Sequence, residues 1–181
     1  MSFISTSVYK TLTTANSGVA IVTGGKSGIG KALALKIASF PFIDKVIAVS
    51  RSIPGADVKE SSKIEAVAAD LATEEGRKTL LQKVTDVCGP LDAPTKPVRF
   101  LIHSAGTIDP IKSVLHVKPD ELRNAMVVNC EAPLFLTTAL YPYLAANDSI
   151  AGRVLHVSSG AAHGAPPVGW SCYGISKAAF Y

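Results

Sequence analysis

Short runs of apolar, mostly β-branched residues alternate along the chain with longer segments in which apolar residues recur every three or four positions. In the first such segment, Ile29, Leu33 and Ile37 share one helical face. Strands that are apolar throughout are typical of a parallel sheet covered by helices on both faces. With right-handed crossovers, this order predicts a doubly wound α/β sheet. The expected strands are 19–23, 45–50, 64–69, 98–103 and 152–158, and the expected helices are 29–39, 73–87 and about 120–145.

Composition limits what such a chain can be. With 181 residues, 48% of them hydrophobic, we expect one domain from residue 18 to 181. Residues 1–17 are rich in Ser and Thr and contain no arginine, which favours a flexible extension over an organelle transit peptide. The net charge of +4 comes from scattered residues, so neither nucleic acid nor a membrane is an expected partner.

The three cysteines, Cys88, Cys130 and Cys172, are far apart in the sequence. They form no CxxC pair or Cys/His cluster, so neither a metal site nor a disulfide framework is predicted. Reduced thiols are typical of an intracellular protein, and the expected compartment is the cytoplasm.

A glycine-rich loop follows the first predicted strand and opens the first predicted helix. It reads TGGKSGIG from Thr23 to Gly30. Glycines allow a tight turn and let backbone N–H groups approach a diphosphate, and the helix N-terminus adds partial positive charge. The context therefore predicts a dinucleotide site, with the candidate contacts Gly24, Lys26, Ser27, Gly28, Ile29 and Gly30.

The end of the second predicted strand indicates which dinucleotide is bound. An NAD site usually has an acid there for the ribose 2′-hydroxyl, whereas this chain has Ser50 and Arg51. An acid would repel a 2′-phosphate, and Arg51 can pair with it through charge-assisted hydrogen bonds. We therefore predict NADP(H) as the cofactor, with Lys26 as a secondary contact.

Near the end of the chain, Tyr173 and Lys177 stand four residues apart, a YxxxK spacing that places them on one face of a helix. A tyrosine, with an ordinary pKa of about 10, exchanges protons poorly at neutral pH unless positive charge favours its phenolate. The ammonium of Lys177 can supply that charge. The pair therefore predicts proton transfer to or from a carbonyl oxygen.

Together, TGGKSGIG and YGISK resemble the corresponding motifs of the short-chain dehydrogenase/reductase family. The resemblance implies a Rossmann-like sheet of order 3-2-1-4-5 without the family's last strands. It also implies NADPH-dependent reduction of a small ketone or aldehyde, or the reverse oxidation of an alcohol. Tyr173 would be the acid–base, and Lys177 would hold the nicotinamide ribose.

Four further positions are assigned through the same resemblance. Asp70 and Leu71 would contact the adenine, although Asp70 also suits a helix N-cap. Ala105 and Gly106 match the last two residues of the family's NNAG motif. Ser104 departs from that motif, because serine cannot replace both functions of an asparagine amide. His103, at the strand end, is expected to be a packed residue and not a catalytic one.

The family's catalytic serine corresponds to Ser159, with Ser158 as the alternative, because Ser159 lies one position farther from Tyr173 than is usual. Asn129 occupies the catalytic asparagine position. Pro133 lacks an N–H, so the carbonyl of Asn129 loses its i+4 donor and the helix should kink. A carbonyl freed in this way can hold a water. This fits the family's proton relay, which runs through asparagine, water and lysine.

The segment from Gly169 to Tyr173 weakly resembles the sepiapterin reductase and benzil reductase branch. The family's members usually continue beyond Lys177, so the chain is expected to be incomplete at its C-terminus. Pairing with a second copy is expected for the longer chain. Ser104 and the longer serine–tyrosine spacing leave a second interpretation open, namely an NADP(H)-binding protein with impaired catalysis.

Overall fold

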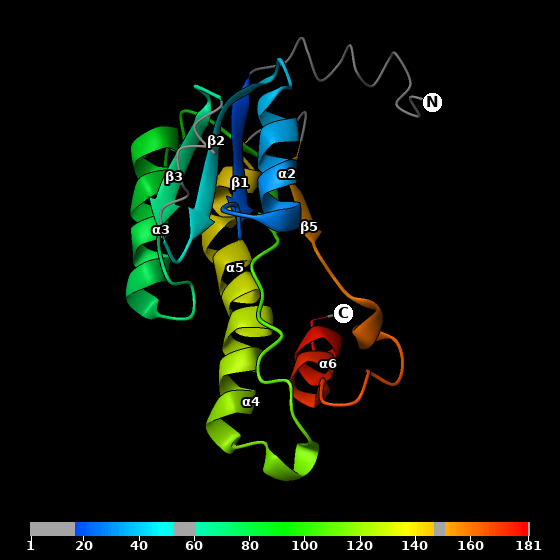
Figure 1. Ribbon diagram of the computed structural model, residues 1–181. Helices are drawn as coiled ribbons and strands as arrows, with labels where there is room; N and C mark the ends of the chain where they lie inside the picture. The colour runs from blue at the N-terminus through cyan, green and yellow to red at the C-terminus, as the bar shows by residue number, and fades with distance from the viewer. Residues whose placement is uncertain (1–16, 53–60, 147–150, 181) are drawn as a thin grey trace.

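The computed structural model describes residues 17–52, 61–146 and 151–180. Five parallel strands form one sheet in the order β3-β2-β1-β4-β5, which confirms the predicted class and strand order (Figure 1). The predicted extension at residues 1–17 falls almost wholly outside the described residues. The strands are β1 (Gly18–Thr23), β2 (Ile43–Ser50), β3 (Ile64–Ala68), β4 (Val98–His103) and β5 (Arg153–His156).

Helices cover both faces of this sheet. On one face, Val22 and Ile102 pack in a core that α2 closes. On the other face, Ile21 and Leu101 pack with side chains of α3 and α5. The burial of both faces explains why β1 and the middle of β2 are apolar without alternation, while most of the charged strand residues, such as Asp44, Lys45 and Arg153, lie near strand starts. The helices are α2 (Gly28–Ala38), α3 (Glu74–Cys88), α4 (Pro119–Met126), α5 (Ala132–Leu144) and α6 (Ser171–Ala178), with short turns η2 (Val114–His116), η3 (Val127–Glu131) and η4 (Gly160–Ala162).

The long helix expected at 120–145 is divided into α4, η3 and α5. The irregularity lies where Pro133 predicts it, but it takes the form of a π-helical turn. The N–H of Ala132 donates to the carbonyl of Val127, five residues earlier. This wider turn accommodates Pro133, at the second position of α5, without a clash against the preceding turn.

The last strand is shorter than the expected 152–158. Strand β5 ends at His156, although the N–H of Val157 still donates to the carbonyl of His103 at 2.9 Å. Residues 157–159 then leave the sheet toward the edge where the other strands end. Within the described sheet β5 has one neighbour, β4, and is an edge strand.

The carboxyl ends of the parallel strands meet at one edge of the sheet, which is where ligands bind in open α/β sheets. The glycine loop follows β1, Arg51 follows β2 and His103 closes β4. No helix in the described part of the chain has the length and apolar character needed to cross a membrane. The fold therefore brings the predicted motifs to a single edge.

Candidate active site

The glycine loop and the start of α2 form the first wall of the site. Gly24 and Gly28 have positive φ angles of 70° and 54°, which favour glycine. A Cβ at Gly30 would lie 2.3 Å from the carbonyl oxygen of Gly24, so the turn requires glycine there too. Beside Gly28, by contrast, a Cβ would meet nothing within 4 Å. The outer side of the loop is therefore open to a ligand.

The N-terminus of α2 is suited to an anion. Ser27 is its N-cap, yet its side chain makes no capping hydrogen bond. The N–H groups of the first turn therefore keep their capacity to donate, and the helix dipole favours negative charge in front of them. These observations fit a dinucleotide diphosphate at this loop, as the sequence predicts.

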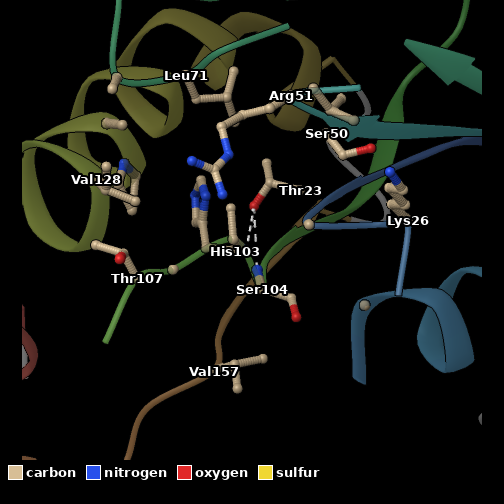
Figure 2. Close-up of a pocket in the computed structure, with 18 of the residues that line it drawn as sticks. Thr23, Lys26, Ser50, Arg51, Leu71, His103, Ser104, Thr107, Val128 and Val157 are labelled. Carbon is tan, nitrogen blue, oxygen red and sulfur yellow. Dashed lines mark hydrogen bonds between the residues drawn. The ribbon is translucent and has the colours of Figure 1, made fainter. Parts of the chain in front are cut away.

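Thr23 connects the loop to β4, a role that the sequence analysis missed. Its hydroxyl accepts from the N–H groups of Ser104 and Ala105, at 3.2 and 3.1 Å (Figure 2). It is buried and is the last residue of the otherwise apolar strand β1, and that position is the signal that could have identified it. Through these bonds the carboxyl ends of β1 and β4, which are neighbours in the sheet, are held together.

Two cations lie at the end of β2. Arg51 is exposed, and its side chain extends over the cleft in Figure 2. Lys26, from the glycine loop, donates to the hydroxyl of Ser52 at 2.7 Å. The loop and the β2 end thus bring a guanidinium and an ammonium to the same side of the cleft. This arrangement can bind a phosphate beyond the diphosphate.

Asp70 lines the cleft after β3, together with Leu71. Its carboxylate accepts from the N–H of Ala72 at 3.0 Å, which holds a turn. The alternative that Asp70 caps the next helix is wrong, because Thr73 is the N-cap of α3 and accepts from the N–H of Gly76 at 3.0 Å. The carboxylate of Asp70 is exposed and keeps acceptor capacity for a ligand in the cleft.

Tyr173 and Lys177 lie one turn apart on α6, as the sequence predicts, and both line the cleft. The Lys177 ammonium lies 5.9 Å from the centroid of the Tyr173 ring and donates to the carbonyl of Val157 at 2.9 Å. Burial lowers the pKa of Lys177 from its ordinary value, because desolvation disfavours the ammonium. With one bond made to the protein, the ammonium retains donors for a ligand.

Asn129 is fully buried in the π-helical turn and does not line the cleft. Its side chain pairs with the backbone of Thr107: the amide oxygen accepts from the N–H, and the amide nitrogen donates to the carbonyl, both at 2.8 Å. The side chain is therefore occupied within the protein. The backbone carbonyl of Asn129, which the Pro133 argument concerns, has no exposed surface either, so a water on this atom would be a buried one.

The two serines after β5 are placed differently. Ser158 is exposed and lines the cleft. Ser159 does not line it, and its hydroxyl accepts from the N–H of Ala161 at 3.2 Å as the N-cap of η4. This bond leaves the hydroxyl hydrogen of Ser159 available. The structure thus brings Ser158 to the cleft directly, while Ser159 stands beside it in a capping role.

His103 is packed, as expected, with 1% of its surface exposed, although it also forms part of the cleft wall. Its Nε2 lies 2.9 Å from the hydroxyl of Thr137. Burial, and to a lesser extent His156, lower the pKa of His103 to about 4, so its ring is neutral at physiological pH. Ser104, where the family motif has asparagine, also lines the cleft.

All these segments enclose one cleft of about 740 Å³. Of the predicted residues, Gly28, Asn129 and Ser159 are not part of its lining. No cluster of three or more His, Cys, Asp or Glu suited to a metal occurs in residues 17–52, 61–146 and 151–180. The predicted residues that line the cleft are Gly24, Lys26, Ser27, Ile29, Gly30, Arg51, Asp70, Leu71, Ala105, Gly106, Tyr173 and Lys177.

Comparison with known proteins gives a consistent picture. Residues 18–181 match the family model described as short chain dehydrogenase. The chain is 32% identical to the short chain dehydrogenase penD of Penicillium thymicola over 170 residues, which cover 88% of this chain and 58% of that protein. It is 31% identical to a benzil reductase ((S)-benzoin forming) of Bacillus subtilis, with 87% and 61% of the two chains covered.

The crystal structure of a short-chain dehydrogenase/reductase from Burkholderia vietnamiensis superposes with a TM-score of 0.73 at 33% identity, covering 91% of this chain and 73% of that one. The chain spans 58% and 61% of the length of the two curated relatives named above. The family match over almost the whole chain, together with the glycine loop and the Tyr173–Lys177 pair on one cleft, confirms the resemblance seen in the sequence: this chain belongs to the short-chain dehydrogenase/reductase family of oxidoreductases.

Proposed function

We propose that the protein is an NADP(H)-dependent oxidoreductase that interconverts a small ketone or aldehyde with the corresponding alcohol. The observation that carries the proposal is the cleft itself. It brings the open glycine loop, the cation Arg51 and the pair Tyr173 and Lys177 into one space of about 740 Å³. An anion site and a proton-transfer pair in the same cleft suit a reaction that transfers hydride and proton to one carbonyl.

Several residues would hold the coenzyme. The N–H groups from Ser27 to Gly30 would bind the diphosphate, with Gly24 and Ile29 completing the turn. Arg51, assisted by Lys26, would bind a 2′-phosphate, and Asp70 and Leu71 would contact the adenine. Ala105 and Gly106 would contact the dinucleotide on the side of β4. The absence of an acid at the end of β2 supports NADP(H) over NAD(H).

The bound coenzyme would supply or accept the hydride. Tyr173 would give its hydroxyl proton to the carbonyl oxygen, or take it back in the oxidation. The ammonium of Lys177, one turn along α6 from Tyr173, would donate to the nicotinamide ribose. Ser159, or Ser158 on the cleft wall, would donate to the oxygen as negative charge develops there. The carbonyl of Asn129 would hold a water that returns protons to Lys177.

Two measurements test this proposal. The value of kcat/KM should be higher with NADPH than with NADH, and a preference for NADH contradicts the assignment of Arg51. Tyr173→Phe should remove turnover and leave NADPH binding intact, because the phenol lies outside the diphosphate and 2′-phosphate contacts. Appreciable turnover by that variant would overturn the acid–base role.

The second candidate is an NADP(H)-binding protein with impaired catalysis. The placement of Ser159 favours it, because this hydroxyl caps η4 and does not line the cleft. A screen of carbonyl compounds, followed by the loss of NADPH absorbance, separates the two candidates. Tight NADPH binding without turnover on any ketone, aldehyde or diketone supports the second one.

The expected partner is a small carbonyl or alcohol molecule. A cytoplasmic setting and pairing with a second copy of a longer chain stay predictions.

A further inference from the structure

Helix α6 carries both proposed reacting residues but lies away from most of the sheet. Figure 1 shows it beside α4, joined to β5 by a long connection. That connection, residues 157–170, contains only the short turn η4. The position of Tyr173 and Lys177 relative to the glycine loop therefore depends on what holds α6 against its neighbours.

Ser176 makes such a contact, and it is fully buried. Its hydroxyl accepts from the side-chain nitrogen of Asn129 at 2.9 Å and donates to the carbonyl of Tyr173 at 2.9 Å. A serine side chain that donates to a carbonyl one turn earlier is common in helices. The bond from Asn129 is different, because it joins α6 to the π-helical turn η3.

Asn129 extends this link to a third segment. The same amide is paired with the backbone of Thr107, in the loop that follows β4. The space beside it is limited, since a Cβ at Gly106 would lie 3.1 Å from the Asn129 side-chain oxygen and 3.6 Å from the Lys177 nitrogen. The β4 loop, the π-helical turn and α6 therefore meet at one buried, fully paired amide.

The geometry of a helix determines what this link controls. Consecutive residues are rotated by about 100° around the helix axis, so Ser176 and Lys177 lie on adjoining faces. Tyr173 and Lys177 share the face that lines the cleft, while Ser176 faces η3. The bond between Asn129 and Ser176 therefore constrains the rotation of α6 about its axis, together with the packing of α6 against α4 and η4. A rotation of this helix would move the phenol and the ammonium together away from the cleft.

We infer that Ser176 is a positioning residue, which acts through Asn129 to keep Tyr173 and Lys177 turned toward the coenzyme. The inference rests on the proposed function for its catalytic consequence. The structural part, that Ser176 holds α6 against η3, stands independently of it.

The test compares Ser176→Ala with Ser171→Ala. Ser171 begins the same helix, and its hydroxyl is buried without a hydrogen-bond partner among the described residues. Both variants remove one buried hydroxyl from α6, but only Ser176→Ala removes the bond to Asn129. Ser176→Cys, which keeps the side-chain volume close to that of serine, replaces Ser176→Ala if the alanine variant does not fold.

One readout needs neither coenzyme nor turnover. Trp170, the single tryptophan of the chain, lies directly before α6, with its ring centroid 5.7 Å from that of Tyr173 in an edge-on arrangement. Its emission spectrum and its quenching by acrylamide therefore report on this end of the helix. Ser176→Ala should increase the quenching of Trp170, and Ser171→Ala should match the wild type.

The second readout separates positioning from loss of folded protein. In Ser176→Ala, kcat should fall about tenfold, the size expected when a neutral hydrogen bond of about 1.4 kcal/mol no longer holds the helix. The number of NADPH sites per chain should stay the same, and Kd for NADPH should change less than threefold, because most coenzyme contacts lie on other elements. A parallel loss of sites and activity would indicate unfolding only and would contradict positioning.

Failure of the positioning role of Ser176 can be told apart from failure of the proposed NADP(H)-dependent activity. If the wild type binds no NADPH, the proposed function fails, while the Trp170 comparison still decides whether Ser176 holds α6. If Ser176→Ala, Ser171→Ala and the wild type agree in Trp170 quenching and in kcat, the inference is overturned.

Discussion

Two histidines lie next to each other on β4 and β5, and one of them, His103, forms part of the cleft wall. His103 and His156 are paired in the strand register, with ring centroids 6.0 Å apart. Neither ring nitrogen of His156 has a hydrogen-bond partner in the described part of the protein, nor does Nδ1 of His103. Burial lowers the pKa of each histidine to about 4, with a smaller contribution from His156 on His103 and from Lys177 on His156. Both rings are therefore held in the neutral form.

This pair should make the fold sensitive to acid. Between pH 6.5 and about 4 the unfolded chain binds protons that the folded chain excludes, so the free energy of unfolding should fall as the pH falls through this window. For His103 alone the loss is on the order of 3 kcal/mol, at about 1.4 kcal/mol per pKa unit. Denaturant unfolding at a series of pH values measures it.

The variant His103→Asn separates the contribution of this histidine to the pH dependence of the free energy of unfolding from the contribution of the carboxylates. It should flatten the dependence on pH between 6.5 and 4, because it removes one group whose charged form the fold disfavours. A wild-type free energy of unfolding that stays constant over this window contradicts the prediction.

Arg51 is the residue on which the choice of coenzyme depends. Arg51→Ala should lower kcat/KM for NADPH by about ten- to hundredfold, as expected for the loss of a charge-assisted hydrogen bond of about 1.5–3 kcal/mol, and should leave kcat/KM for NADH nearly unchanged. Lys36→Ala, an exposed cation on α2 outside the cleft, is the control and should affect neither coenzyme. Equal losses of kcat/KM with both coenzymes would show that Arg51 does not bind the 2′-phosphate.

At the scale of elements, the π-helical turn η3 is the feature on which the site depends most. It lies between α4 and α5, presents Asn129 to the β4 loop and to α6, and places Pro133 in the cleft wall. Pro133 has no N–H for the carbonyl of Asn129, so the turn is built into the sequence at this point. A proline here shapes the site as well as the helix.

Pro133→Ala should therefore lower kcat more than it lowers stability. Alanine supplies the missing N–H, which allows an ordinary helical turn to form and engages the carbonyl of Asn129. We expect turnover to fall about tenfold while the free energy of unfolding changes by about 1 kcal/mol or less, because Pro133 lies in the first turn of α5, where proline costs a helix little.

Pro142, inside the same helix, provides the matched control. Pro142→Ala also introduces an N–H into α5, but at a distance from the cleft, and it should leave kcat unchanged. If Pro133→Ala has wild-type turnover, the carbonyl of Asn129 has no part in proton return.

At the scale of the whole molecule, β5 is the vulnerable part of the described sheet. It pairs only with β4, and Val154 and Leu155 are each 44% exposed. An edge strand with exposed apolar residues offers unpaired backbone groups to another chain.

The 181-residue chain should consequently self-associate through this edge as its concentration rises. Leu155→Lys places a charge on the edge and should shift light-scattering and sedimentation profiles toward the monomer, while Ile175→Lys, an exposed apolar position on α6, should not. A monodisperse wild-type chain at high concentration would contradict the prediction.

The sequence by itself determined the class of the fold and most of the cleft. Apolar strand runs specify a sheet buried on both faces, and the order of elements specifies how it is wound. The glycine loop and Arg51 follow directly from positions at strand ends, because parallel strands end at one edge. These are local patterns, so they can be read without knowing which distant residues meet.

Only the tertiary structure decided the contacts between distant segments. The pairing of Thr23 with the β4 turn, and the meeting of Thr107, Asn129 and Ser176, join residues far apart in the sequence. Whether Ser158 or Ser159 faces the cleft depends on the path of the chain after β5, which no periodicity encodes. Hydrogen bonds of single buried side chains depend on the packing of whole elements, and that packing is settled only when the chain has folded.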